Sequence, residues 1–113
     1  MPISNLRFIK RLAEFCPRDS SIKDVPKNTR GIYTLLMKRG DDYEVVYIGM
    51  SRGTKLGIHS RLNSHAKSQR KKPLWSHFSI YEVHDNVSEA EIVELEGLVR
   101  HVYRRDPKTN RIN

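Results

Sequence analysis

The sequence predicts a small α+β domain, in which a three-stranded, mostly antiparallel β-sheet is flanked by helices and preceded by one extra N-terminal helix. Two runs of β-branched and aromatic residues flank a short polar turn, which is typical of a β-hairpin. Three segments space their apolar residues three and four apart, as helices do, and one further short run has the composition of a strand. The chain of 113 residues suits one hydrophobic core, because two cores would need about twice that length.

The first expected element is a helix over residues 5–15, with Ser4 as a suitable N-cap. Residues 17–30 form a polar connector that contains two prolines. We therefore expect residues 1–29 to be a helical extension before the main domain of residues 30–113. The apolar stripe of this helix would cover the domain, bind a protein partner or form a homodimer. It consists of Leu6, Ile9, Leu12, Ala13 and Cys16.

A β-hairpin is predicted next, with strands over residues 31–37 and 43–49. Tyr33 and Tyr47 are equidistant from Gly40. If the turn is centred on Gly40, the two rings stand opposite each other on one face of the hairpin. Aromatic pairs of this kind also stabilise hairpins that have no further role, so the pair by itself does not indicate chemistry.

Three more elements follow the hairpin. Residues 58–70 have a helical pattern, and residues 75–83 resemble a third strand. The last helix runs from Ser88 to about residue 104, because Ser88 and Glu91 have the spacing of a capping box. Its expected buried stripe is Ile92, Leu95, Leu98, Val99, Val102 and Tyr103.

The composition narrows the function classes. Lys and Arg total 21 and Asp and Glu total 13, which gives a net charge of +8. An excess of this size predicts attraction to nucleic acid, with a merely basic, solvated surface as the alternative. No stretch approaches 18 apolar residues, so we expect no membrane span. Cys16 is the single cysteine, which is typical of a reducing compartment, and we expect the cytoplasm.

The two later helices carry candidate chemistry. Arg61 and His65 are four residues apart and therefore share one helix face. A guanidinium matches a phosphate, and an imidazole transfers protons near neutral pH. Glu96 lies at the edge of the apolar stripe, whereas Glu94 points nearly away from the core. A carboxylate turned toward the protein body is costly unless it is paired or bound to a cation, so Glu96 is the candidate metal ligand and Glu94 the alternative.

Gly31-Ile32-Tyr33 and Tyr47-Ile48-Gly49, at the two ends of the predicted hairpin, resemble the signature of the GIY-YIG nuclease family. The other residue types of that family follow in order over residues 30–113: Arg61, His65, Glu96 and Asn110. The resemblance implies an endonuclease that hydrolyses DNA phosphodiester bonds with one divalent ion, Mg²⁺ or Mn²⁺.

The resemblance also implies a role for each residue. Glu96 would hold the metal, which polarises the phosphate, and Arg61 would neutralise charge in the transition state. Tyr33 would be the general base, and Tyr47 would position the water or contact the phosphate. Free tyrosine has a pKa near 10, so the cations around Tyr33 and the neighbouring His65 would have to lower that pKa or the proton would have to pass onward.

Two positions in this pattern stay open. The interval before Arg61 is longer than in many family members, with an apparent insertion around residues 52–57, so Arg52 is the alternative to Arg61. Asn110, or else Asn113, would hold the metal site or the terminal segment in place.

Basic side chains near these residues are expected to contact the phosphate backbone of DNA, and RNA stays an open alternative. They are Arg52, Lys55, Lys67, Arg70, Lys71 and Lys72. We expect weak sequence preference or recognition of an unusual DNA structure. The alternative function is a non-catalytic nucleic-acid-binding module that keeps the nuclease fold. Trp75 would stack on a base or, as we favour, belong to the core.

Overall fold

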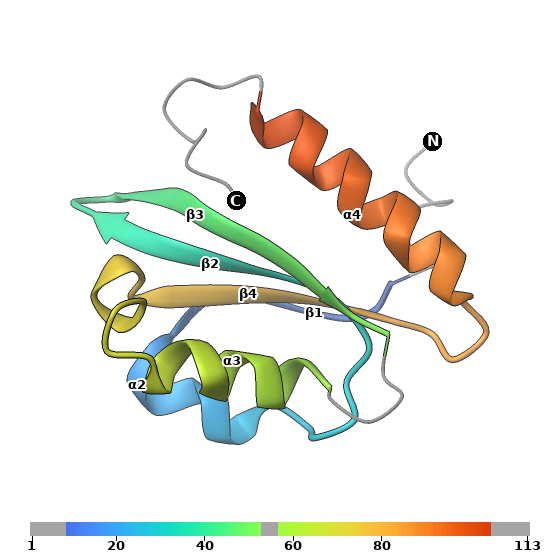
Figure 1. Cartoon of the computed structure of the whole chain (residues 1–113), viewed down its shortest axis with the longest axis horizontal. Helices are drawn as coiled ribbons and strands as arrows, with labels where there is room; N and C mark the ends of the chain where they lie inside the picture. Colours follow the sequence, from blue (N-terminus) through green and yellow to red (C-terminus); the bar gives the residue numbers. More distant parts are fainter. Residues whose placement is uncertain (1–8, 53–56, 105–113) are drawn as a thin grey trace.

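A computed structural model describes residues 9–52 and 57–104 and shows an α+β fold (Figure 1). In these residues, one antiparallel sheet has four strands in the order β1-β4-β2-β3. The strands are β1 (Ile9–Pro17), β2 (Gly31–Arg39), β3 (Asp42–Ser51) and β4 (His77–Val83). The helices are α2 (Arg18–Ser21), α3 (Ile58–Lys67) and α4 (Glu89–Arg104), and the 3₁₀ turns are η1 (Ile22–Asp24) and η2 (Lys72–Leu74). The α+β class is confirmed, but the sheet has four strands rather than three.

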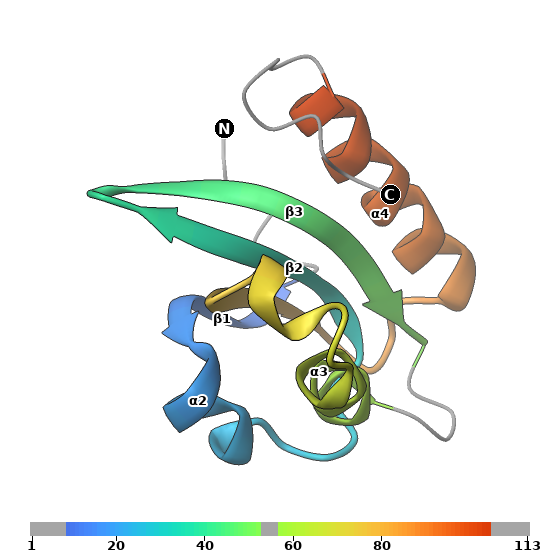
Figure 2. The ribbon, with the colours of Figure 1, turned by 60° about the vertical axis from the view of Figure 1, so that its left-hand side comes forward.

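Helices cover both faces of the sheet. α4 lies across one face, and α2 and α3 lie against the other face (Figures 1 and 2). Successive side chains of a strand point to opposite faces, so the central strand β2 supplies both cores. Tyr33 and Leu35 pack on the α3 side with Leu62 and Trp75. The core on the α4 side contains Ile32, Leu36, Val45 and Ile48, with Leu95 and Val99 packed against it.

A bulge interrupts the β2–β3 hairpin, whose two strands run beyond their predicted ends. Leu36 pairs with Val45, but the next residue, Leu35, pairs with Tyr47. Val46 is therefore the extra residue, and a bulge of this kind re-aims the side chains that follow it. Val45 belongs to the core on the α4 side, whereas Val46 and Tyr47 both pack on the α3 side. The bulge thus brings Tyr47 to the face that Tyr33 occupies.

The predicted pairing of Tyr33 with Tyr47 is wrong. Tyr33 pairs with Gly49, so the two tyrosines are diagonal neighbours on the same face. Two shifts cause the difference. The turn is centred between Gly40 and Asp41 rather than on Gly40, and the bulge adds a further residue to β3.

The predicted N-terminal helix is also wrong where the structure describes it, because residues 9–17 form the edge strand β1. This strand pairs with β4 in antiparallel orientation. Only Ile9, Ala13 and Cys16 are half-buried in β1, and its other residues are exposed. Their spacing of four and three residues is the same as that of a helix face. Residues 1–8 lie outside the described part of the chain.

Two irregularities in β1 produce this helix-like spacing. The register shifts between Ile9 and Arg11 and again between Ala13 and Cys16. Each shift adds one residue, which breaks the two-residue alternation of a regular strand. Phe15 lies in the second irregularity with φ 56°, and its backbone N–H donates to Ser79 Oγ at 3.0 Å. Pairing with the edge of β4 therefore decides the structure of this segment.

The later elements agree with the sequence pattern. α3 and β4 lie inside the predicted ranges 58–70 and 75–83. No helix in the two described ranges is both long enough and apolar enough to span a membrane.

Helix α4 begins at the predicted capping box. Glu91 donates its backbone N–H to Ser88 Oγ at 3.1 Å, and Ser88 donates its own to Glu91 Oε1 at 2.8 Å. Ile92 is buried as predicted, but Leu98 is 63% exposed and does not belong to the buried stripe. Leu98 instead lines an apolar groove between α4 and the sheet, and its side chain is open to solvent there. The side chains of residues 102–104 lie outside the described structure.

Candidate active site

Three ring side chains from β2, β3 and α3 meet on the α3 face of the sheet. Tyr33 Oη lies 3.2 Å from Nε2 of His65, which is a hydrogen-bond distance. The Tyr47 ring centroid is 4.9 Å from that of His65 and 6.1 Å from that of Tyr33. The fold therefore brings three of the predicted site residues together, and we name Tyr33, Tyr47 and His65 the ring cluster.

The glycines of the two signature tripeptides have steric roles in the hairpin. A Cβ on Gly49 would lie 2.5 Å from Tyr33 Oη and closer still to the ring carbon that carries it. Glycine at this position thus lets the Tyr33 ring lie across β3 and reach His65. Gly31 has φ 144°, a conformation that side chains disfavour, and a Cβ there would collide with the carbonyl oxygen of Tyr81.

Burial sets the protonation state of Tyr33. The residue is 1% exposed. Burial and the neighbouring Tyr47 raise the pKa of Tyr33 well above its ordinary value, although Arg61 and Arg100 act in the opposite direction. Arg61 lowers this pKa as expected, but the desolvation of Tyr33 outweighs it, which leaves the alternative that the proton passes onward. Tyr33 is a neutral hydroxyl near pH 7.

His65 is the natural acceptor for the Tyr33 proton. Burial, together with the positive charges of Lys71 and Arg61, lowers the pKa of His65 below its ordinary value of 6.5. The imidazole is consequently neutral at pH 7. When its Nδ1 carries the ring proton, its Nε2 can accept the hydrogen bond that Tyr33 donates.

Arg61 lies on α3, one turn before His65, and its side chain is exposed. It is close enough to Tyr33 and His65 for its charge to lower the pKa of both. An exposed guanidinium beside a ring cluster is available for a phosphate. The alternative, Arg52, follows the end of β3 and is exposed too, but it does not act on the pKa of either residue.

Glu96 belongs to α4, which covers the face of the sheet opposite to the ring cluster. Its carboxylate is paired with Arg100, whose Nε donates to Glu96 Oε2 at 2.7 Å. Arg100 also donates through Nη2 to the carbonyl oxygen of Ile48, and its guanidinium lies 6.0 Å from the centroid of the Tyr47 ring. β3 is an edge strand, so Arg100 joins Glu96 to the ring cluster around that edge. Glu94, the alternative, is exposed.

Arg100 is a site residue that the sequence interpretation missed. Arg100 stands four residues after Glu96. A glutamate and an arginine at this spacing on a helix commonly pair, and that rule would have identified it.

The donor set near Glu96 fits a single hard cation. Carboxylate and carbonyl oxygens are the ligands that Mg²⁺ prefers, and Mg²⁺ keeps several of its waters, so one carboxylate suffices. Glu96 and the Ile48 carbonyl supply such oxygens, and both now bind the guanidinium of Arg100. A metal at Glu96 would therefore compete with Arg100. Residues 9–52 and 57–104 contain no group of three or more His, Cys, Asp or Glu side chains suited to a metal.

Two of the basic residues that are expected to contact phosphates lie beside the ring cluster. Lys67 and Lys72 are exposed, and Arg70 and Lys71 line a pocket that also includes Tyr47 and His65. Two predicted site residues, Lys55 and Asn110, and the alternative Asn113 lie outside the described residues.

Comparisons with known proteins add no family. No protein-family model matches the chain, and a search of curated proteins finds no significant match. The likeness to GIY-YIG nucleases therefore stays a prediction that depends on the residues themselves.

Proposed function

We propose that this protein is a metal-dependent endonuclease of the GIY-YIG type that hydrolyses DNA phosphodiester bonds. The observation that carries the proposal is the ring cluster, in which Tyr33 hydrogen-bonds a neutral His65 within reach of Arg61. A hydroxyl with an acceptor imidazole can take up a proton, and an exposed guanidinium can neutralise a phosphate, and phosphodiester hydrolysis uses both contributions.

Tyr33 and His65 act together as the general base. The pKa of Tyr33 is too high for a standing phenolate at neutral pH. Tyr33 instead takes the proton of the attacking water as it passes its own proton to His65 Nε2, 3.2 Å away. Tyr47 is half-buried beside both residues and positions the water or the phosphate.

Charge stabilisation comes from the two sides of the β3 edge. Arg61 neutralises the phosphate oxygens in the transition state from the α3 side. Glu96, with the Ile48 carbonyl, would hold one Mg²⁺ or Mn²⁺, and such an ion would supply Lewis-acid activation of the phosphate. Arg100 would release Glu96 for this role and would then contact the negatively charged substrate.

The expected substrate preference follows from the basic side chains that are available to contact phosphates. Arg52, Lys67, Lys72 and their basic neighbours attract phosphates, which provide affinity but no sequence information. We therefore propose low sequence specificity or selectivity for an unusual DNA structure, and an intracellular site of action. A protein partner or a second copy would add specificity.

The second candidate is a non-catalytic nucleic-acid-binding module. The Glu96–Arg100 pair favours it, because a paired carboxylate already has a structural partner. The two candidates differ in what Glu96 does: a nuclease needs it, whereas a binder gains nothing from a carboxylate that faces DNA.

Cleavage of plasmid, linear, branched and single-stranded DNA with Mg²⁺ or Mn²⁺ tests the proposal. We expect metal-dependent cleavage that is lost in Tyr33→Phe and in Glu96→Ala, with DNA affinity kept or increased in Glu96→Ala. Exposed Glu94→Ala is the matched control and should cleave normally. Salt-sensitive binding without cleavage of any substrate would support the binding module instead.

A further inference from the structure

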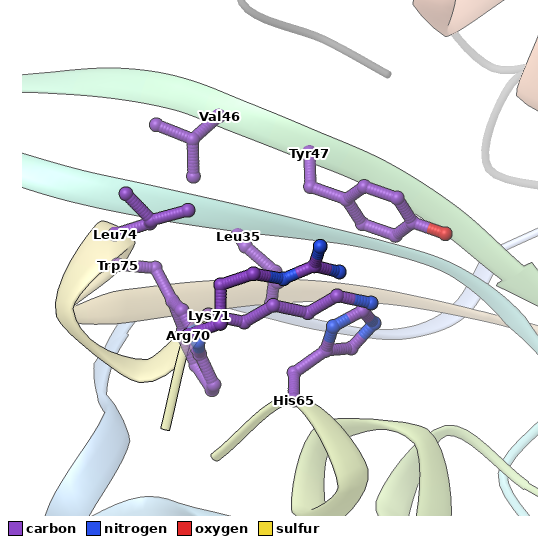
Figure 3. Close-up of a pocket in the computed structure, with 8 residues that line it drawn as sticks. All are labelled: Leu35, Val46, Tyr47, His65, Arg70, Lys71, Leu74 and Trp75. Atoms are coloured by element: carbon purple, nitrogen blue, oxygen red, sulfur yellow. The ribbon is translucent and has the colours of Figure 1, made fainter. Parts of the chain in front are cut away.

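A pocket of about 340 Å³ opens beside the ring cluster and has two chemically different ends. Tyr47, His65, Arg70 and Lys71 form its polar end, and Figure 3 shows the long side chains of Arg70 and Lys71 extending toward Tyr47 and His65. The apolar end is formed by Leu35, Val46, Leu74 and Trp75. Specific small-ligand sites have this composition, with apolar walls and a few polar groups that orient the ligand.

The polar end matches a phosphate. Arg70 and Lys71 lie side by side in sequence after α3, and within the described residues neither forms an ion pair. No acidic side chain lines the pocket. Lys71 lines the pocket together with His65, and its positive charge lowers the pKa of that imidazole. An anion bound here would therefore lie next to Tyr47 and His65.

The apolar end matches the flat ring of a nucleobase. The half-buried side chain of Val46 and the exposed side chain of Leu74 offer apolar surfaces on which a ring can lie. Trp75 is only 1% exposed, so its indole forms the floor beneath these side chains, and its expected place in the core is confirmed.

The bulge of β3 creates this site. Since Val46 is the extra residue, Val46 and Tyr47 both face the α3 side instead of alternating. One of them lines the apolar end and the other the polar end. The loop on the far side is held in place by Arg18, which donates to the carbonyl oxygens of Lys72 and Trp75.

We propose that this pocket binds one unstacked nucleotide of the nucleic-acid substrate, with its base against Val46 and Leu74, above the buried Trp75, and its phosphate on Arg70 and Lys71. The proposal deepens the proposed function, on which it rests for the identity of the macromolecule, and it makes that phosphate the one nearest the ring cluster. A base reaches such a pocket only from a single strand, a branch or a flipped position. The pocket therefore selects substrates that have unpaired nucleotides.

The test uses Trp75, the single tryptophan of the chain, as a fluorescent reporter. The intact protein is titrated with thymidine monophosphate and adenosine monophosphate, with inorganic phosphate and thymidine as partial ligands. We expect saturable changes in fluorescence with the nucleotides and weaker binding of either partial ligand. Deoxyribose and ribose forms of each nucleotide compare the DNA and RNA sources. Nucleotides that bind no more tightly than phosphate would overturn the proposal.

Two pairs of variants locate the binding. Val46→Phe fills the apolar end and should weaken nucleotide binding about tenfold, in line with the loss of one stacked base. Its matched control is Val93→Phe, at an exposed position of α4. Arg70→Ala with Lys71→Ala should weaken binding more than Lys23→Ala with Lys27→Ala, which removes the same charge elsewhere. Equal affinities within both pairs would overturn the proposal, and the second pair leaves the apolar walls intact if Val46→Phe fails to fold.

Failure of this proposal is distinguishable from failure of the proposed function. Nucleotide titrations do not require cleavage, so they are repeated with Glu96→Ala, which should bind nucleotides as the unaltered protein does. Normal nucleotide binding without DNA cleavage refutes the nuclease and supports the pocket. DNA cleavage that Val46→Phe leaves unchanged, with no nucleotide binding, refutes the pocket and supports the nuclease.

Discussion

The two edge strands of the sheet, β1 and β3, both contain bulges, but the bulges have different consequences. In β3, the extra residue Val46 turns Tyr47 toward Tyr33 and His65 and so assembles the candidate site. In β1, two register shifts give a strand in which only every third or fourth side chain is half-buried. Bulges re-aim side chains. The bulge in β3 thus assembles the candidate site, whereas the two irregularities in β1 allow that strand to pair with the edge of β4.

Stacked rings connect the two edges. Phe15, in the second irregularity of β1, stacks on Tyr43 of β3 with ring centroids 4.4 Å apart. His77 of β4 meets the same Tyr43 ring edge-on at 5.2 Å. The edge strands therefore differ in function but share one aromatic contact across the sheet.

Deletion of a bulge residue should have the largest effect and should differ most between the two edge strands. Deleting Val46 forces one end of the hairpin to exchange its two faces, so Tyr47 loses His65 or the α4-side core loses Val45. We expect cleavage to be lost and the free energy of unfolding to fall by about 3 kcal/mol or more. Deleting Lys10 from β1 is the matched change and should leave cleavage measurable. Urea denaturation and the cleavage assay measure both effects, and equal effects of the two deletions would contradict the difference between the edges.

Substitution of Gly49, the glycine under the Tyr33 ring, should have the next largest effect on the free energy of unfolding. Gly49→Ala places a methyl group against the Tyr33 ring, and overpacking of this kind costs about 1–3 kcal/mol. Gly97→Ala on α4 is the control, because a Cβ there meets nothing within 4 Å and should stabilise the helix by about 1 kcal/mol. The two variants should shift the midpoint of urea unfolding in opposite directions. A shift in the same direction would mean that the Tyr33 ring moves aside at little cost.

The proposed function makes the Glu96–Arg100 ion pair a competitor of the metal at Glu96. Arg100→Met removes the guanidinium that Glu96 binds, so we expect half-maximal cleavage at an Mg²⁺ concentration about tenfold lower. Maximal cleavage should decrease if Arg100 also contacts the substrate. Replacement of Arg11, an exposed arginine paired with Glu82 of β4, is the control and should not change the metal requirement. A metal requirement that stays constant in Arg100→Met would show that the pair does not compete with the metal.

The pH dependence of cleavage should reveal His65. Its pKa is below 6.5 because of burial and because Lys71 and Arg61 face it, while Tyr33 and Tyr47 add no charge at neutral pH. His65 accepts a proton only in its neutral form, so cleavage should fall with decreasing pH at a pKa below 6.5. In His65→Gln the remaining activity should lack this acidic limb. A limb that persists in His65→Gln, or one centred above pH 6.5, would exclude His65 as the acceptor.

His65 should also make the free energy of unfolding depend on pH. The folded state favours neutral His65, so the unfolded chain binds more protons between the two pKa values. The free energy of unfolding should therefore fall as pH falls below 6.5, and by less in His65→Gln, which chemical denaturation at several pH values measures.

The aromatic contact between the edges should have the smallest effect. Phe15→Ala removes the stacking on Tyr43 and should cost about 1 kcal/mol of stability while cleavage stays unchanged. Leu12→Ala, at a comparably exposed position of β1, is the control. A clear loss of cleavage in Phe15→Ala would show that β1 and the candidate site are coupled.

The sequence by itself determined the parts of the fold that depend on neighbouring residues. The hairpin, the capping box of Ser88 and Glu91, the buried face of α4 at Ile92 and the shared face of Arg61 and His65 all follow from local spacing. These patterns depend on residues only a few positions apart, so they can be recognised in the sequence without knowledge of the tertiary contacts.

Only the tertiary structure decided the bulges and their consequences. The spacing of Ile9, Ala13 and Cys16 predicts a helix, but the edge of β4 offers backbone partners that make the segment a strand. The extra residue at Val46 has no local signature, yet it brings Tyr47 to His65 and opens the pocket beside Trp75. The protonation of Tyr33 likewise depends on burial that many distant residues create together, because desolvation is a property of the packed core rather than of a motif.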